Sequence, residues 1–264
     1  MESLNHTELD ELRRARSLIE NPSLAARLTD VIGKPIEKSV ALLPDKVVRT
    51  VHEIVESALE RALELAVATM KDPSARGASE RWHKLAGATS GAIGGFFGLA
   101  GLAVELPITT VIMLRSIGDI ARSEGQDITD PGVRVACLEV FALGGTSTSD
   151  NAAETGYYAI RSALGKLVSD ATAHIAQRGL SARGAPAIVR LLERIGSRFG
   201  LVVQEKVVLE MVPAIGAVSG ALINTIFMGH FQSVARGHFI IRRLEARHGI
   251  EVVRAAYERL GLET

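Results

Sequence analysis

Apolar residues recur at helical spacing along almost the whole chain of 264 residues. In the segment 45–70, apolar side chains three and four positions apart line one face, and Glu53, Glu56, Glu60 and Glu64 gather on the opposite face. This is the pattern of an amphipathic α-helix whose acidic face is solvated. No segment alternates with a period of two between turn residues, the pattern that predicts a β-strand. We therefore predict an all-α protein.

Several segments carry residues that begin helices. Thr7 followed by Asp10 resembles a capping box, so we expect the first helix to begin there. Thr129 or Asp130 precedes Pro131, a residue suited to the first turn of a helix. Side-chain oxygens at such positions accept hydrogen bonds from the first backbone amides of a helix, which lack partners within the helix.

Prolines and glycines divide the rest of the chain into helices with short connections. Pro107 is expected to start a new helix that ends near Gly125. The stretch 71–80 combines Pro, Gly and Ser and is the clearest linker. We predict about nine or ten helices that form a single domain, with an N-terminal helical region 1–70 and a larger helical region 79–264.

Two long apolar runs interrupt the amphipathic pattern. Leu85–Val104 contains 20 residues without a charge, and Met211–Ala235 contains 25 residues without Asp, Glu, Lys or Arg. Both runs contain the pattern GA-x-SGA, and glycines in the first run are spaced by four. Small residues at this spacing let two helix backbones approach closely, so we expect two Gly-rich helices packed together at the centre of the fold. The residues expected at this crossing are Gly87, Ser90, Gly91, Gly95, Gly216, Ser219 and Gly220.

The setting of these apolar runs stays open at the level of the sequence. Twenty apolar residues suffice to cross the hydrocarbon core of a bilayer. After Glu105, however, only a short segment precedes Arg115, and it is too short to cross back. Basic residues flank the first run on both sides, which places both of its ends in the cytoplasm. A buried helical pair in a water-soluble fold, reversible insertion into a membrane and a true span are the three alternatives.

Composition excludes several classes of function. The chain has 30 basic and 30 acidic residues, so no overall charge attracts nucleic acid, and aromatic residues make up only 4%, too few for a base-stacking surface. Cys137 is the only cysteine, which excludes an internal disulfide and a cysteine-based zinc site. No P-loop or dinucleotide motif is present, and we predict no cofactor and no metal. The polar N-terminus lacks a signal-peptide pattern, so we expect a cytoplasmic protein, alone or peripheral on the inner face of the membrane.

Polar side chains inside or beside the apolar segments form the candidate site. A buried charge without a partner is costly, so we expect these groups to pair, for example Glu105 with Arg115 or Arg161. Three interpretations remain: a structural network of ion pairs, a site that binds an anionic head group or a substrate carbonyl, and an acid–base centre. The candidate residues are Glu105, Arg115, Asp119, Glu154, Tyr157, Tyr158, Arg161 and Asn224.

Four stretches of the chain resemble the EcsC family of bacterial proteins. They read SGAIGGFFGLAGLAVELPITTVIMLRSIGDIARSEGQDITDP, FALGG, AAETGYYAIRSAL and VPAIGAVSGALINTIFMGHFQSVARGHFIIRRLEARHG, and they lie between roughly residues 80 and 260. The family more often has Asp at the position of Glu105, a difference that keeps the carboxylate. The resemblance implies a mainly helical bacterial protein associated with membranes, and it supplies no catalytic residues.

The sequence therefore favours a non-enzymatic helical protein that binds a lipid, an acyl chain or an inner-membrane protein through its apolar centre. The alternative is a hydrolase or another enzyme that uses Glu105, Arg115, Glu154 and Arg161. The oligomeric state is not predicted by any of these patterns.

Overall fold

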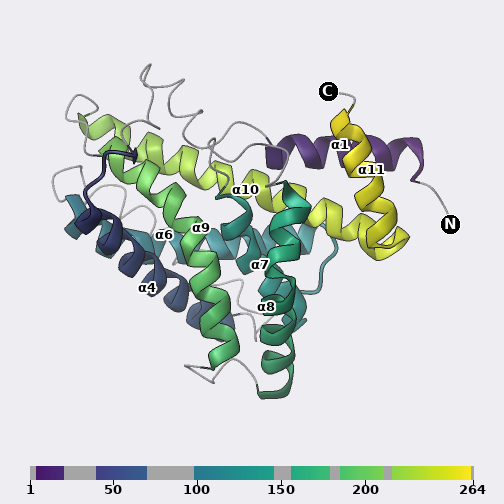
Figure 1. The fold of residues 1–264 in the computed structure, drawn as a ribbon, viewed down its shortest axis with the longest axis horizontal. Coiled ribbons are helices and arrows are strands. Elements are labelled where there is room, and N and C mark those ends of the chain that lie inside the picture. The colour runs from purple at the N-terminus through teal and green to yellow at the C-terminus, as the bar shows by residue number, and fades with distance from the viewer. Residues whose placement is uncertain are drawn as a thin grey trace.

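The computed structural model describes residues 4–20, 40–69, 98–145, 156–178, 185–210 and 216–262. Within these ranges the chain forms eight helices and no strand, so the predicted all-α class is confirmed (Figure 1). The sequence predicts about nine or ten helices for the whole chain, and the described residues form eight. They are α1 (His6–Glu20), α4 (Asp45–Thr69), α6 (Gly98–Ser123), α7 (Pro131–Leu143), α8 (Tyr157–Arg178), α9 (Pro186–Glu210), α10 (Gly216–His248) and α11 (Ile250–Leu262).

The helix starts follow side-chain capping, although one predicted cap is misplaced. The capping box of α1 is formed by Asn5 and Glu8 rather than from Thr7: the Glu8 N–H donates to Asn5 Oδ1, and the Asn5 N–H donates to Glu8 Oε2, each at 3.0 Å. At α7 the expected cap is confirmed, because Asp130 Oδ1 accepts a hydrogen bond from the Gly132 N–H at 2.6 Å.

The expectation of a new helix at Pro107 is wrong, because α6 continues through this residue. Proline removes one backbone donor, and in a helix interior it costs about 3 kcal/mol. The adjoining turn is buried, with Leu106 fully enclosed and the Thr110 hydroxyl donating to the Leu106 carbonyl at 2.7 Å. Burial of this turn offsets the lost backbone bond. The helix then ends close to Gly125, as predicted, where a φ of +80° suits glycine.

The amphipathic helix predicted over 45–70 is confirmed as α4. Its apolar face, which includes Val51, Val55 and Leu59, is fully buried, and its glutamates are exposed. This face packs against α6 and α9.

The central helix of the fold is α7. Ten of its residues are buried, and α6, α8, α9 and α10 pack around it. Phe141 on this helix lies 4.9 Å from the ring of Phe199 and 5.5 Å from that of Phe231, so aromatic packing ties α7 to α9 and α10. Burial also raises the pKa of the Cys137 thiol to about 12, and this cysteine therefore acts as a small apolar side chain.

Two glycines at the end of α7 let neighbouring elements approach closely. A Cβ atom on Gly145 would lie 2.5 Å from the carbonyl oxygen of Arg198, and one on Gly144 would lie 2.5 Å from the ring of Phe231. A ring nitrogen of His230 is hydrogen-bonded to the Gly144 carbonyl oxygen at 2.8 Å. The Arg198 guanidinium donates to the Gly145 carbonyl oxygen at 3.3 Å. These contacts satisfy carbonyls that the helix end leaves without partners.

The two helices that carry the ends of the apolar runs, α6 and α10, pack against each other. The Gln232 amide donates to the Ser116 hydroxyl at 2.8 Å across this contact. The crossing predicted for the first run, at Gly87, Ser90, Gly91 and Gly95, lies outside the described residues. Gly216, Ser219 and Gly220 begin α10, but the packing of their side-chain positions is likewise outside the described part. The Gly-rich crossing therefore stays a prediction.

One helix in the described ranges is long and apolar enough to cross a membrane. It is the segment Gly101–Ser123 of α6, and 61% of its apolar window is buried inside the molecule. A core helix of a soluble protein has the same length and composition, so this segment does not by itself indicate a span.

Candidate functional site

Seven polar side chains from three helices lie together toward the C-terminal end of α10. Three come from the first turns of α8, three lie on one face of α10 at spacings of four and three, and one comes from α7. Hydrogen bonds and electrostatic interactions connect them across the helices. We call Glu139, Tyr157, Tyr158, Arg161, His238, Arg242 and Glu245 the buried polar cluster.

An ion pair between α8 and α10 forms the centre of the cluster. Arg161 donates to Glu245 Oε1 at 2.7 Å, and the Tyr158 hydroxyl donates to the same oxygen at 2.9 Å. Only 16% of the Arg161 side chain and 6% of the Glu245 side chain are exposed, so removal of either partner would leave a charge with little access to water.

The hydrogen bonds around Tyr157 define which ring nitrogen of His238 carries the proton. Arg161 donates to the Tyr157 oxygen at 3.2 Å, and that oxygen lies 2.9 Å from His238 Nδ1. Burial raises the pKa of Tyr157 and lowers that of His238 well below its usual range, so the phenol keeps its proton and the imidazole is neutral. The arrangement that satisfies both groups has the Tyr157 O–H donating to Nδ1. His238 then carries its own proton on Nε2.

Two buried donor atoms in the cluster lack acceptors. His238 Nε2 and Arg242 Nε are enclosed and have no hydrogen-bond partner among the residues that the structure describes. Arg242 follows His238 by one helical turn, which places both side chains on one face of α10. An enclosed donor without an acceptor costs about 1–3 kcal/mol, so this face of the cluster favours an incoming oxygen atom.

The charge balance of the cluster is cationic. Arg161 and Arg242 each carry a positive charge. Among the other members, only the Glu245 carboxylate is directly paired with a cation, Arg161. Burial raises the pKa of Glu139, which favours its neutral acid form, and no hydrogen bond to Glu139 occurs among the described residues. The cluster can therefore accept a negative charge from outside the chain.

The pairing expected for Glu105 is wrong. Its carboxylate lies 2.6 Å from Lys206 Nζ, on α9, and the Lys206 side chain is fully buried. Arg161, which was one expected partner, pairs with Glu245 instead. Charges far apart along the chain thus form two separate buried pairs, one between α6 and α9 and the other between α8 and α10.

Among the described residues, three further predicted site residues take no part in the hydrogen bonds of the cluster. Asp119 is exposed and accepts from Arg122 at 2.8 Å, and Arg115 lies half-buried near Asp119. Asn224 lies near the start of α10, with a buried Oδ1 that lacks a hydrogen-bond partner. Glu154 is outside the described residues.

Sequence reasoning found Tyr157, Tyr158 and Arg161 but missed the partners on α10. The signal was present in the segment GHFIIRRLE, where His, Arg and Glu recur at spacings of four and three within an apolar helix. The contribution of Glu139 had no comparable signal, because only the packing of α7 brings this residue to the cluster.

The neutral state of His238 predicts a pH-dependent stability. Below about pH 6.5 the unfolded chain binds a proton on this imidazole and the folded chain does not, so the free energy of unfolding should fall as the pH falls. The slope from this group is up to about 1.4 kcal/mol per pH unit. His238→Gln should remove it between about pH 5 and 6.5, as measured by urea unfolding. His6→Gln, which removes an exposed histidine of α1, is the control. Equal slopes in the wild type and His238→Gln would contradict a neutral His238.

A protein-family model matches most of the chain. The family model of the EcsC protein family matches residues 6–244. The matched range begins in α1, ends within α10 and includes every member of the buried polar cluster except Glu245. No curated protein and no solved structure matches the chain.

Proposed function

This chain belongs to the EcsC protein family, and we propose that it is a non-enzymatic binding protein whose buried polar cluster holds the anionic head group of a lipid. One observation carries the proposal: the enclosed donors His238 Nε2 and Arg242 Nε have no acceptor. A phosphate or carboxylate oxygen supplies the acceptor that both need, and its negative charge suits the cationic balance of the cluster.

The surroundings of the cluster favour an amphipathic anion over a small inorganic one. The rings of Tyr157 and Tyr158 lie 5.0 Å apart edge to face, and the Tyr257 ring packs against both. A small inorganic anion would lose its whole hydration shell and gain only two hydrogen-bond donors. An anion that carries an alkyl chain also gains free energy when the chain is buried against apolar side chains. We place the protein in the cytoplasm, peripheral on the inner face of the membrane, where it meets such lipids.

A hydrolase or another acid–base enzyme is the second candidate, and one observation favours it. The cluster combines a carboxyl group with a raised pKa, Glu139, the state required of a general acid, with a neutral imidazole, His238, which would act as a base through the Tyr157 hydroxyl bonded to its Nδ1. In an enzyme of this kind, Glu139→Gln should abolish turnover of an ester or phosphoester lipid. In the binding protein we propose, neither the wild type nor this variant turns over such a lipid.

The binding proposal is tested by calorimetric titration with monododecyl phosphate below its micelle concentration. Wild-type protein should bind it, and Arg242→Gln should bind at least about ten-fold more weakly, because a charge-assisted hydrogen bond is worth about 1.5–3 kcal/mol. Arg236→Gln is the matched control: it removes an exposed arginine from the same helix and should bind like the wild type.

Two further titrations separate the possible sources of the signal. Dodecyl maltoside has the same alkyl chain without a charge, and inorganic phosphate has the charge without the chain. Binding of inorganic phosphate as tight as that of the alkyl phosphate would replace the lipid by a free anion as the ligand. Equal binding of the maltoside, or equal affinity of Arg242→Gln and the wild type, would overturn the proposal.

A further inference from the structure

The first helix lies directly over the turn of α10 that carries His238. α1 packs chiefly against α10 and α11, at the C-terminal end of α10 (Figure 1). At Gly237 the approach is so close that a Cβ atom would lie 2.6 Å from the Ala15 carbonyl oxygen and 2.7 Å from the Ile19 side chain. Glycine at this position therefore lets the α1 backbone rest on α10, one residue before a member of the buried polar cluster.

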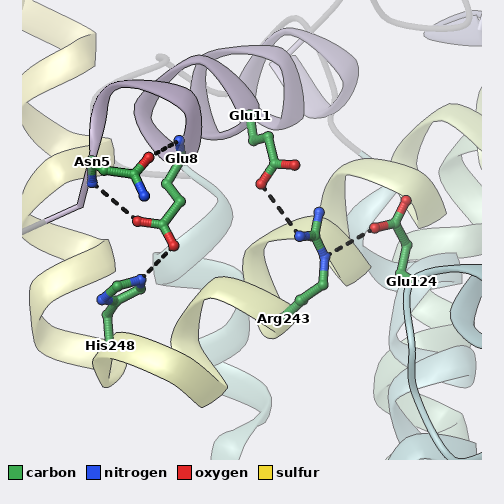
Figure 2. Close-up of polar contacts among 6 residues, drawn as sticks. All are labelled: Asn5, Glu8, Glu11, Glu124, Arg243 and His248. Atoms are coloured by element: carbon green, nitrogen blue, oxygen red, sulfur yellow. Dashed lines mark hydrogen bonds and ion pairs between the residues drawn. The ribbon is translucent and has the colours of Figure 1, made fainter.

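Polar contacts fasten α1 along its exposed edge. A ring nitrogen of His248 lies 2.8 Å from a Glu8 carboxylate oxygen, and Arg243 lies between Glu11 on α1, at 3.3 Å, and Glu124 after α6, at 3.2 Å. Figure 2 shows these contacts. The hydrogen bond from His248 lowers the pKa of Glu8, so this carboxylate is charged at neutral pH. Such partly exposed pairs contribute little to stability individually.

Tyr257 connects α1 to the cluster. Its hydroxyl donates to Glu20 at 3.0 Å, and the guanidinium of Arg16 lies 5.4 Å from its ring centroid. The centroid of the same ring lies 5.7 Å from that of the Tyr157 ring and 5.4 Å from that of the Tyr158 ring. One aromatic ring therefore separates α1 from the tyrosines of the cluster.

The part of the cluster around His238 and Tyr157 is enclosed, so a ligand that reaches His238 requires an opening. His238 is 0% exposed and Tyr157 is 2% exposed. Among the helices around the cluster, α1 buries the fewest residues, Leu12, Ala15 and Ile19, against four on α11, six on α8 and ten on α7. Of these walls, α1 has the smallest apolar contribution, and an element of this kind opens at a lower free energy than the core.

We propose that α1 is a displaceable cover, and that its release from α10 and Tyr257 gives the ligand access to the buried polar cluster. This inference rests on the proposed binding function, because it assigns the route to that site. Its first consequence does not depend on a ligand: displacement of α1 exposes the His238 ring to small reagents in solution.

The rate of His238 carbethoxylation by diethyl pyrocarbonate, followed by mass spectrometry, tests this consequence. Gly237→Ala should displace α1 and raise the rate at least about ten-fold, because local opening then costs less. Gly229→Ala is the matched control, since it lies on the same helix and its added Cβ meets nothing within 4 Å. Hydrogen exchange of residues 6–20 should speed up in the first variant only.

A second pair of variants acts on α1 alone and leaves α10 unchanged. Glu8→Gln combined with Glu11→Gln removes the charges that bind His248 and Arg243, while glutamine at position 8 keeps the capping box. It should raise the His238 labelling rate, and Asp10→Asn, on the exposed side of α1, should not. Faster exchange in α1 with unchanged labelling of His238 in both variants would overturn the cover.

The rate at which monododecyl phosphate associates with the protein tests the cover separately from the proposed binding function. If α1 is the cover, Gly237→Ala should bind the probe at least about ten-fold faster than Gly229→Ala. Equal association rates would overturn the cover and leave the binding site in place. Faster labelling of His238 with no binding of the probe to any variant would contradict the lipid-binding function, whereas the cover would stand.

Discussion

Replacing Lys206 by methionine should lower the free energy of unfolding by about 3–5 kcal/mol. The Lys206 side chain is fully buried, and its ammonium group lies 2.6 Å from Glu105, whose side chain is 11% exposed. Without the lysine, the Glu105 carboxylate stays buried between apolar helices and no longer has the ammonium group that balances its charge. Denaturant unfolding of the purified variant measures the loss.

A second substitution tests whether the loss arises from the orphaned charge. Lys206→Met combined with Glu105→Leu removes both charges and should recover most of the lost stability, because apolar residues of similar volume often replace a buried ion pair at little cost. Equal destabilisation in the single and double variants would show that the lysine acts through other contacts, and it would contradict this account of the pair.

Substituting Gly145 by alanine should also destabilise the fold, by about 1–3 kcal/mol or more. The added Cβ would lie 2.5 Å from the backbone oxygen of Arg198, and a backbone atom within a packed helix cannot move aside as a side chain can. The junction at the end of α7 would have to open, and with it the aromatic packing of Phe141 on Phe199.

Gly165 on α8 is the control for this substitution. A Cβ at that position meets nothing within 4 Å, so Gly165→Ala should stabilise the protein by about 0.5–1 kcal/mol through the helix propensity of alanine. Thermal unfolding of the two variants should therefore shift in opposite directions. A stabilised Gly145→Ala would mean that the end of α7 does not approach α9 this closely.

Local sequence patterns predict the helices of this fold well, because helix formation depends on neighbours three and four positions away. The apolar face of α4 with its opposite glutamates, the cap at Asp130 and the end of α6 near Gly125 all follow from residues within one or two turns. The failure at Pro107 has the opposite origin, since burial of the neighbouring Leu106 depends on packing that no local pattern contains.

The candidate site is only half predictable for the same reason. The YYAIR segment places Tyr157, Tyr158 and Arg161 together because they share the first turns of one helix. Their partner Glu245 lies 84 positions beyond Arg161 in the chain, and Glu105 and Lys206 are 101 positions apart. Which opposite charges meet across such separations depends on how the helices pack, so the expected pairing of Glu105 with Arg161 had no local support.

The fold assigns different roles to the two buried charge networks. The ion pair of Glu105 and Lys206 joins α6 to α9 and serves stability. The buried polar cluster retains donors without acceptors at His238 and Arg242, and α1 lies against its turn of α10. We therefore propose that ligand binding occurs at the cluster, and we predict that Arg242→Gln changes affinity more than stability.

The nitrogen NMR spectrum of the His238 imidazole, recorded without and with monododecyl phosphate, tests the central claim most directly. In the free protein at neutral pH, the account predicts a neutral ring with its proton on Nε2, and addition of the probe should shift the Nε2 resonance while Nδ1 keeps its bond to Tyr157. A proton on Nδ1 in the free protein, or an Nε2 resonance unchanged at saturating probe, would contradict it.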